Sequence, residues 1–248
     1  MSSLFGTEKM AAGYATSRPA LHSQVIERIR QHRGIALPMN TALDVGCGAG
    51  LSTHPLREIA VRCLGLEPAE AMLGWTRTVA PGAEFLVGRA EALPVRSNSI
   101  DMITAAGSLN YADLSRFFPE ARRVLRPGGS LVVYDYSQGR GLDAWFSDFM
   151  SRYPPPVNSA HKITPESLQS LPYGFRVDDH EYFDLHHGMN CAEYLDYMMT
   201  ETNVAWAVVN GTPEEEIRDW CAETLSPLFH GTARDFVFPG YIAYLSPA

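Results

Sequence analysis

A glycine-rich turn directly after an apolar run sets narrow limits on how this chain can fold. Residues 41–50 read TALDVGCGAG, a short buried strand followed at once by Gly46, Gly48 and Gly50. Glycine lets the backbone turn sharply and approach a ligand closely. In an open parallel sheet, the first strand-to-helix turn lies beside the point where strand order reverses, and ligands bind there. The stretch therefore predicts a ligand-binding turn early in an α/β domain.

The rest of the first half alternates short apolar strands with amphipathic helices. Such alternation indicates a parallel sheet with helices on both faces. Strands are predicted in RCLGLEP (62–68), EFLVG (84–88), SIDMITAAG (99–107) and SLVVYDY (130–136), and helices in 20–31, 54–60, 69–80 and 114–125. The fold expected is a doubly wound, mostly parallel, seven-stranded α/β sheet of the Rossmann-like kind.

The pattern changes after about residue 140. Helices are expected around 145–150, 191–203 and 213–229, and strands at 174–185 and 235–246. Thr212 is the expected N-cap of the last helix, and Pro239-Gly240 an expected kink or bulge. We expect one domain over 1–248. Its parts are an N-terminal segment (1–35), a cofactor-binding half (36–140) and a substrate half (141–248) with a helical cap around 188–230.

The spacing of the glycines and two acids indicates the ligand. The dinucleotide fingerprint GxGxxG needs a glycine at position 51, which is Leu51 here. Glu67 ends the second strand at the crevice edge, where a carboxylate can accept hydrogen bonds from ribose hydroxyls. Together with Asp44, it indicates a ligand with a ribose and an ammonium group.

Composition excludes several classes of partner and site. The net charge of −8 is unfavourable for binding nucleic acid or anionic lipid. The four cysteines match neither a paired zinc motif nor a disulfide framework, so no metal site is expected. The N-terminus lacks a signal-peptide core, and no apolar stretch is long enough to span a membrane. A cytoplasmic protein with free thiols is expected.

Four motifs in order resemble the class I S-adenosylmethionine-dependent methyltransferases, and in particular the small-molecule branch with the type 11 and trans-aconitate methyltransferases. They are LDVGCGAG, LEPAEAML, GRAEALPVRSNSID and RRVLRPGGSLVV. The resemblance covers residues 10–136 well and the C-terminal third loosely. It implies a methyl transfer with S-adenosylmethionine as cofactor and S-adenosylhomocysteine as product.

The resemblance also implies roles for individual residues. Those implied to contact the cofactor are Asp44, Gly46, Cys47, Gly48 and Gly50 (methionine part, with Asp44 fixing the loop or facing the ammonium group), Glu67 (ribose), Pro68, Met72, Ala90 and Glu91 (adenine), and Gly107 and Ser108 (sulfonium side). Relatives often carry an aspartate before the Ala-Glu pair; Arg89 stands here and cannot accept a hydrogen bond. Adenine recognition would then rest on backbone groups or Glu91.

The N-terminal segment from Tyr14 to Pro19 resembles a Tyr-x-x-x-Arg-Pro segment that closes over the cofactor in this branch. The resemblance implies that Tyr14 covers the ligand and that Arg18 meets the methionine carboxylate. Guanidinium–carboxylate pairing is strong and geometrically defined. The alternative interpretation is a solvated arm with a helix-starting proline.

No catalytic residue is obvious, which is compatible with methyl transfer because the cofactor carries the difficult chemistry. A base is needed only when the acceptor holds a proton that must leave. Candidates near the strand ends are Asn110, Tyr111 and Asp135, of which Asp135 could be a base and Asn110 could orient an acceptor. His186-His187 fits a solvated turn better than a catalytic site.

The helix that contains Tyr197, followed by Thr200 and Thr202, resembles a substrate-covering insertion. Its aromatic and methionine side chains suit a planar or apolar small-molecule acceptor, although they could equally pack the insertion on the sheet. Three functions stay open: a small-molecule O-, N- or C-methyltransferase, a peptide or protein methyltransferase, and a cofactor-binding domain without methyl transfer. Neither nucleic acid nor a membrane is expected as partner.

Overall fold

A computed structural model describes residues 6–156, 162–171 and 173–248. Its described strands form one seven-stranded sheet in the order β3-β2-β1-β4-β5-β7-β6. The strands are β1 (Met39–Val45), β2 (Ala60–Glu67), β3 (Glu84–Val87), β4 (Ile100–Ala106), β5 (Leu125–Tyr136), β6 (Phe175–Met189) and β7 (Arg234–Pro247). Each strand expected from the sequence is present.

The first five strands are parallel, and β7 runs antiparallel between β5 and β6. Strand order reverses at β1, which pairs with β2 on one side and β4 on the other. This is the switch point of a doubly wound sheet, where the carboxyl ends of the strands open onto a ligand. The mostly parallel, Rossmann-like fold expected from the alternation is confirmed.

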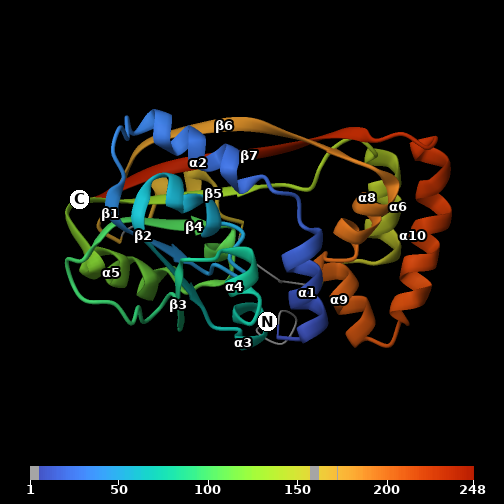
Figure 1. Cartoon of the computed structure of the whole chain (residues 1–248), viewed down its shortest axis with the longest axis horizontal. Helices are drawn as coiled ribbons and strands as arrows, with labels where there is room; N and C mark the ends of the chain where they lie inside the picture. The colour runs from blue at the N-terminus through green and yellow to red at the C-terminus, as the bar shows by residue number, and fades with distance from the viewer. Residues whose placement is uncertain (1–5, 157–161, 172) are drawn as a thin grey trace.

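Helices cover both faces of the sheet (Figure 1). One face packs on α2 and continues into the cap helices; the other packs on α5 and α7. Successive side chains of β5 point to opposite faces, so that Val132 lies in the apolar cluster on the α2 side and Val133 in the cluster on the α5 side. The helices are α1 (Glu8–Ser17), α2 (His22–His32), η1 (His54–Glu58), α3 (Glu70–Leu73), α4 (Thr76–Val79), η2 (Ser108–Tyr111), α5 (Leu114–Val124), α6 (Asp143–Arg152), α7 (Pro165–Gln169), α8 (Cys191–Met198), α9 (Thr202–Val209) and α10 (Glu214–Phe229).

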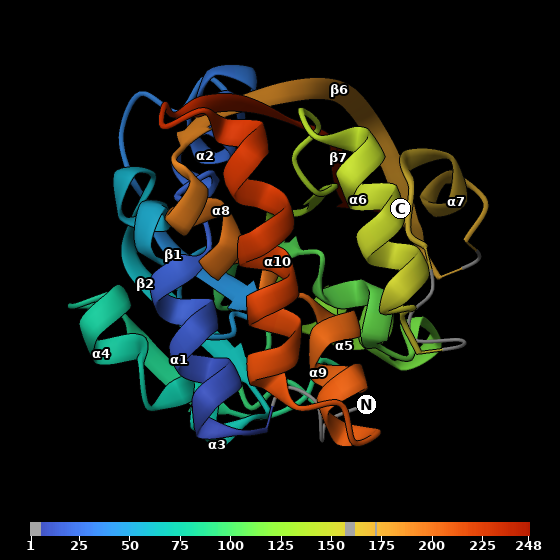
Figure 2. The same cartoon turned by 90° about the vertical axis from the view of Figure 1, so that its right-hand side faces the viewer.

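A helical cap lies beyond one end of the sheet. The long strands β6 and β7 extend toward it, and α6, α8, α9 and α10 form it (Figures 1 and 2). Helix α1 contacts both α3 beside the sheet and α8 of the cap. The N-terminal helix therefore bridges the two parts over the carboxyl ends of the central strands.

The local expectations were wrong at several points. Residues 54–58 form a 3₁₀ turn, and Gly74 caps α3 so that 69–80 splits into two short helices. Pro213, not Thr212, is the N-cap of α10, and the Thr212 backbone N–H donates to the Ala207 carbonyl in α9. Helix α1 was not expected as a helix.

Pro239-Gly240 is neither a kink nor a bulge. Both residues pair in regular register with β6, and the register shift lies at residues 177–179 instead. A Cβ on Gly240 would lie 2.5 Å from the backbone oxygen of Asp135. Close strand packing therefore requires the glycine.

None of the described helices has the length and apolarity that a membrane crossing needs. The four cysteines are unpaired, as expected from their spacing. The described residues also contain no cluster of three or more acidic, histidine or cysteine side chains that could hold a metal ion.

Candidate active site

The glycine turn after β1 has the backbone that its sequence predicts. Gly46, Gly48 and Gly50 have φ angles of 73°, 54° and 97°, in the region that favours glycine. A Cβ on Gly46 would lie 2.3 Å from the Cβ of Ser108. The backbone N–H groups of Gly46 and Cys47 both donate to the Leu66 carbonyl near the end of β2. The turn is therefore fixed against the strands on either side.

Asp44 holds this turn from beneath. Its side chain is fully buried and accepts hydrogen bonds from Ser52 (2.6 Å), Thr53 (2.7 Å) and Thr104 (3.1 Å). Burial raises the pKa of the Asp44 carboxyl, and these three bonds oppose the rise. Of the two roles considered for Asp44, the structure favours fixing the loop.

Glu67 stands at the end of β2 beside the turn. Its carboxylate accepts the backbone N–H of Gly48 at 3.1 Å and that of Ala69 at 2.9 Å. Burial raises the pKa of Glu67, against the effect of the two backbone bonds. Each carboxylate oxygen can accept a further bond. Glu67 therefore joins the glycine turn to the second strand and keeps capacity for ligand hydroxyls.

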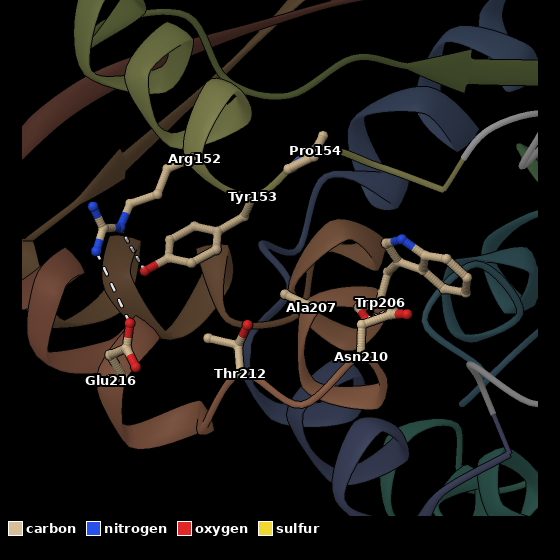
Figure 3. A pocket seen from close by; sticks show the side chains of 8 residues that line it. All are labelled: Arg152, Tyr153, Pro154, Trp206, Ala207, Asn210, Thr212 and Glu216. Atoms are coloured by element: carbon tan, nitrogen blue, oxygen red, sulfur yellow. Dashed lines mark hydrogen bonds and ion pairs between the residues drawn. The ribbon is translucent and has the colours of Figure 1, made fainter.

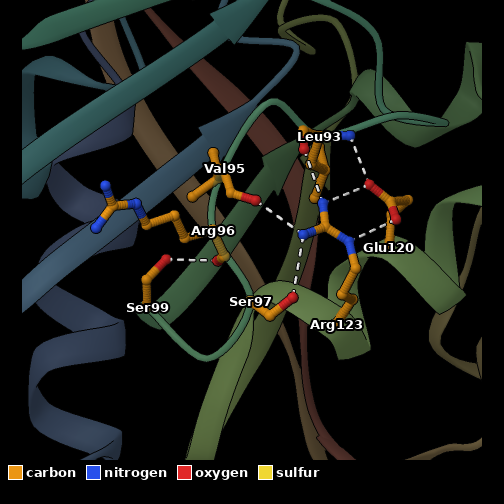
Figure 4. A network of polar contacts seen from close by, with 7 residues as sticks. All are labelled: Leu93, Val95, Arg96, Ser97, Ser99, Glu120 and Arg123. Atoms are coloured by element: carbon orange, nitrogen blue, oxygen red, sulfur yellow. Dashed lines mark hydrogen bonds and ion pairs between the residues drawn. The ribbon is translucent and has the colours of Figure 1, made fainter.

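The segment between β3 and β4 carries the residues implied to contact adenine. Figure 4 shows how Arg123 of α5 holds it. Arg123 donates to the carbonyls of Leu93 and Val95, both at 2.8 Å, and pairs with Glu120, whose carboxylate accepts the Leu93 N–H. Since four hydrogen bonds join the segment to this ion pair, the segment has a defined course.

The implied adenine contacts occupy different environments. Ala90 is half-buried, and Glu91 accepts the backbone N–H of Asp113, a bond that ties it to the start of α5. Pro68 is exposed, whereas Met72 is buried in a small cluster under α1. The structure brings the ends of β2 and β3 together, since Glu67 pairs with Val87.

Helix α1 places Tyr14 and Arg18 over the strand ends. The Tyr14 ring is the nearest group to a Cβ placed on Gly48, at 3.9 Å. Arg18 donates to the Thr200 carbonyl at 3.1 Å, pairs with Glu201 at 3.1 Å, and lies over the rings of Tyr14 and Tyr197. The protein thus binds Arg18 through the cap and not through the loop.

Arg18 nevertheless keeps one donor. Its Nε–H is buried and has no hydrogen-bond acceptor among the described residues, whereas Oε1 of Glu201 is the oxygen that pairs with the Arg18 guanidinium at 3.1 Å. A buried unpaired donor is costly unless a ligand satisfies it. This geometry leaves one N–H of the guanidinium available to an anionic group.

The end of β4 and the 3₁₀ turn η2 form the next part of the site. Gly107 has φ 64°, and a Cβ there would lie 3.0 Å from Oδ1 of Asp135. The Ser108 hydroxyl donates to the Val45 carbonyl. Asn110 donates to Oδ2 of Asp135 at 2.9 Å and accepts the Ile163 N–H at 3.2 Å. One N–H of the Asn110 amide therefore holds Asp135, and its oxygen holds the backbone at Ile163.

Asp135 is the best-placed acid at the carboxyl end of β5. Burial raises its pKa, while Asn110, the Tyr136 N–H and the charge of Arg18 lower it. A carboxyl with a raised pKa and a free lone pair is what a general base near neutral pH needs. Tyr111, beside it, is 48% exposed.

A histidine that the sequence did not single out lies behind these residues. His22, at the start of α2, is within 3.0 Å of the Tyr134 hydroxyl and 3.1 Å of the Tyr136 hydroxyl. Burial and the charge of Arg18 lower the pKa of His22 to about 4, so it is neutral at pH 7. The only sequence signal was the i, i+2 spacing of the two tyrosines on one face of a strand.

The residues predicted to contact substrate lie in the cap. Tyr197 and Thr200 are buried, and their contacts hold Arg18, while Thr202 is half-buried at the start of α9. His186 pairs with Asp235 at the surface, as a solvated position would. Among the described residues, the structure thus gathers Arg18, Tyr197 and Thr200 at the strand ends and leaves the His pair outside.

A hollow of about 380 Å³ lies away from these residues, between α6, α9 and α10, and Figure 3 shows Trp206 and Tyr153 among its walls. None of the predicted site residues lines it. Because α1 packs directly on the glycine turn, the candidate site is covered. The site is identified by its glycine turn, its buried acids and Arg18, and not by an open cavity.

Comparisons with known proteins agree with this geometry. Residues 43–133 match the family described as "Methyltransferase domain". This segment runs from the glycine turn through β5 and holds Glu67 and Ser108. This segment of the chain is therefore similar to a methyltransferase domain.

Several curated methyltransferases are similar to this chain over part of their length and part of its own. An uncharacterised methyltransferase of Mycobacterium tuberculosis is 32% identical over 131 residues, which are 53% of this chain and 51% of that protein. A demethylmenaquinone methyltransferase of Renibacterium salmoninarum is 34% identical over 145 residues, 57% of this chain and 61% of that one. The chain spans about half the length of several curated relatives it matches.

One solved structure aligns with most of this chain. It was described as "a Putative Type II Methyltransferase from Anaeromyxobacter dehalogenans", with a TM-score of 0.68, 23% identity, and coverage of 88% of this chain and 94% of that one. A geranyl diphosphate C-methyltransferase of Streptomyces coelicolor, solved with S-adenosyl-L-homocysteine, gives a TM-score of 0.51 at 18% identity over 91% of this chain and 79% of that one. At such identities the likeness shows the fold alone.

Proposed function

We propose that this protein transfers the methyl group of S-adenosylmethionine to a small molecule. The observation that carries the proposal is the bond between Gly48 and Glu67, which joins a left-handed glycine turn to a strand-end carboxylate at the switch point. A turn that admits close approach and an acid with open lone pairs suit a nucleoside with ribose hydroxyls. The matched methyltransferase domain supports the same ligand.

The residues present fit this cofactor. Glu67 would hold the ribose hydroxyls, and the backbone of Gly46, Cys47 and Gly48 would lie along the methionine part. The buried, unpaired Nε–H of Arg18 would meet the methionine carboxylate. Met72, Ala90 and Glu91 would border the adenine. Tyr14, which already covers Gly48, would close the site from above.

The chain's own contribution to the reaction is placement and exclusion of water. When bound, S-adenosylmethionine supplies a methyl group on a sulfonium, a good leaving group. The acceptor atom must lie in line with that bond, so alignment can supply much of the rate. Gly107 and Ser108 would line the sulfonium side, between the cofactor over β1 and an acceptor over β4 and β5. Helix α1 and the cap would exclude solvent.

Asp135 would take the proton of an acceptor that must lose one. Its raised pKa and its fixed position, held by Asn110 and the Tyr136 N–H, suit that role. An acceptor carboxylate would not need it. Asn110 would position the Asp135 carboxylate through its hydrogen bond.

A small-molecule acceptor is supported by the named activities of relatives. They include malonyl-[acyl-carrier protein] O-methyltransferase, demethylmenaquinone methyltransferase and phthiotriol/phenolphthiotriol dimycocerosates methyltransferase. Within this chain, Tyr194, Tyr197 and Trp145 of the cap are buried aromatic residues of one apolar cluster, and the Tyr197 ring lies against Arg18. Tyr197, Thr200 and Thr202 are the cap residues placed nearest the acceptor in this proposal.

The test is calorimetric titration of the full chain with S-adenosylmethionine and with S-adenosylhomocysteine, followed by labelled-methyl transfer into small-molecule extracts. We expect both nucleosides to bind, and Glu67→Ala to weaken binding. The control is Glu84→Ala, which removes an exposed acid that pairs with Arg62 at the sheet edge. No binding of either nucleoside would refute the proposal.

A further inference from the structure

Two tyrosines of β5 share one histidine behind the candidate acceptor position. His22 Nδ1 lies 3.0 Å from the Tyr134 hydroxyl, and His22 Nε2 lies 3.1 Å from the Tyr136 hydroxyl. Both tyrosines point to the same face of the sheet because they are two residues apart on a strand. Tyr134 is fully buried, whereas Tyr136 is half-buried at the carboxyl end of the strand.

Counting protons fixes the direction of both bonds. A neutral imidazole has one N–H donor and one acceptor nitrogen. In the described part of the chain, His22 Nδ1 is the sole hydrogen-bond partner of the buried Tyr134 hydroxyl. That hydroxyl must donate to Nδ1, because the reverse direction would leave a buried O–H without an acceptor. The proton of His22 then resides on Nε2, and Nε2–H donates to the oxygen of Tyr136.

The hydroxyl hydrogen of Tyr136 is consequently directed away from His22. No described residue accepts it, since the His22 contact is the one bond of that hydroxyl. Burial raises the pKa of Tyr136, so the group keeps its proton and can donate it in a hydrogen bond. Tyr136 follows Asp135 at the end of β5, on the side of β4 away from the glycine turn.

We propose that the Tyr136 hydroxyl donates a hydrogen bond to an oxygen atom of the methyl acceptor, and that His22 is the positioning residue that orients it. The inference rests on the proposed function for its ligand and deepens it by naming the acceptor's chemistry. The acceptor carries a carboxylate, phenol or carbonyl oxygen. A molecule whose only polar group is a protonated amine has no lone pair to accept a hydrogen bond from the Tyr136 hydroxyl.

The proton arrangement is tested first, without any ligand. Nitrogen-15 NMR of the histidine-labelled full chain distinguishes the two neutral tautomers, and His22→Gln identifies the His22 signals by their loss. We expect a protonated Nε2 and an unprotonated Nδ1 at neutral pH. A protonated Nδ1, or an imidazolium, at pH 7 would overturn the assignment.

The ligand class is tested by titrating acetate, benzoate and phenol into the chain saturated with S-adenosylhomocysteine. At least one should bind the wild type, and Tyr136→Phe should weaken its binding by about tenfold or more, as expected for one hydrogen bond to a charged oxygen. Benzylamine serves as the matched ligand without oxygen, and Tyr136→Phe should leave its affinity unchanged. Tyr182→Phe, which removes an exposed hydroxyl on β6, is the control variant.

Equal binding of the oxygen probes by wild type and Tyr136→Phe would overturn the inference, as would failure of every oxygen probe to bind the saturated wild type. Failure of S-adenosylhomocysteine itself to bind would refute the proposed function instead. The tautomer of His22 is measured in the free chain, so that result separates the two failures.

Discussion

The neutral state of His22 makes stability depend on pH in a defined window. Burial and Arg18 lower the pKa of His22 from 6.5 to about 4 in the folded chain. As pH falls below 6.5, the unfolded chain binds a proton that the folded chain does not. The stabilisation is fully present above pH 6.5 and is lost as pH falls through about 4. Each pKa unit corresponds to about 1.4 kcal/mol, so the loss is about 3 kcal/mol.

The assay is urea unfolding of the wild type and of His22→Gln at pH 7.5, 5.5 and 4. Between the first and last of these, the free energy of unfolding of the wild type should fall by about 3 kcal/mol more than that of the variant. Taking the difference removes groups common to both, such as the buried Asp44, Glu67 and Asp135, whose raised pKa values act in the opposite direction. The two proteins can differ in their free energy of unfolding by the same amount at every pH for other reasons. The prediction concerns only the change of that difference with pH.

An exposed histidine supplies the control. His54→Gln changes a side chain at the surface of η1 and should follow the wild type at each pH. If the difference between wild type and His22→Gln stays constant from pH 7.5 to 4, His22 is not held neutral, and the account of its buried contacts is refuted.

Three further outcomes follow from the site. Gly46→Ala should lower the free energy of unfolding by about 1–3 kcal/mol in urea denaturation, because it combines a positive φ with a Cβ 2.3 Å from that of Ser108; wild-type stability would contradict this. Glu67→Gln should weaken S-adenosylmethionine binding about tenfold or more by calorimetry, since an amide has one accepting atom where the carboxylate accepts the Gly48 N–H and a second backbone N–H; unchanged affinity in a folded variant would show that the ribose lies elsewhere. Asp135→Asn should slow labelled-methyl transfer to a phenol but not to a carboxylate. If the variant transferred methyl to the phenol at the wild-type rate, Asp135 would be excluded as the base.

Much of the cofactor side was predictable because its determinants are local in sequence. The glycines at 46, 48 and 50 need their left-handed backbone whatever packs on them. Glu67 ends an apolar strand, and strand ends in a parallel sheet meet at one edge. The positions of the seven strands followed from the sequence pattern, whereas Pro239-Gly240 was misjudged because its constraint is a neighbouring strand's carbonyl and not its own turn.

The acceptor side depended on contacts that sequence spacing does not encode. Asn110 could be assigned to an acceptor from sequence, yet the folded chain gives its amide to Asp135 and the Ile163 N–H. The sequence offered no signal that His22 would meet Tyr134, a residue 112 positions later.

The sheet, the glycine turn and the acid beside it could be predicted from the sequence, because backbone conformation and strand polarity are set by neighbouring residues. The contacts of Arg18 with the cap residues Thr200 and Glu201, and the donor that Tyr136 presents, follow from the folded arrangement alone. Those choices depend on how α1, α2 and the cap pack over the strand ends. Such packing joins residues more than a hundred positions apart, and it alone settles which polar atoms are left for a ligand.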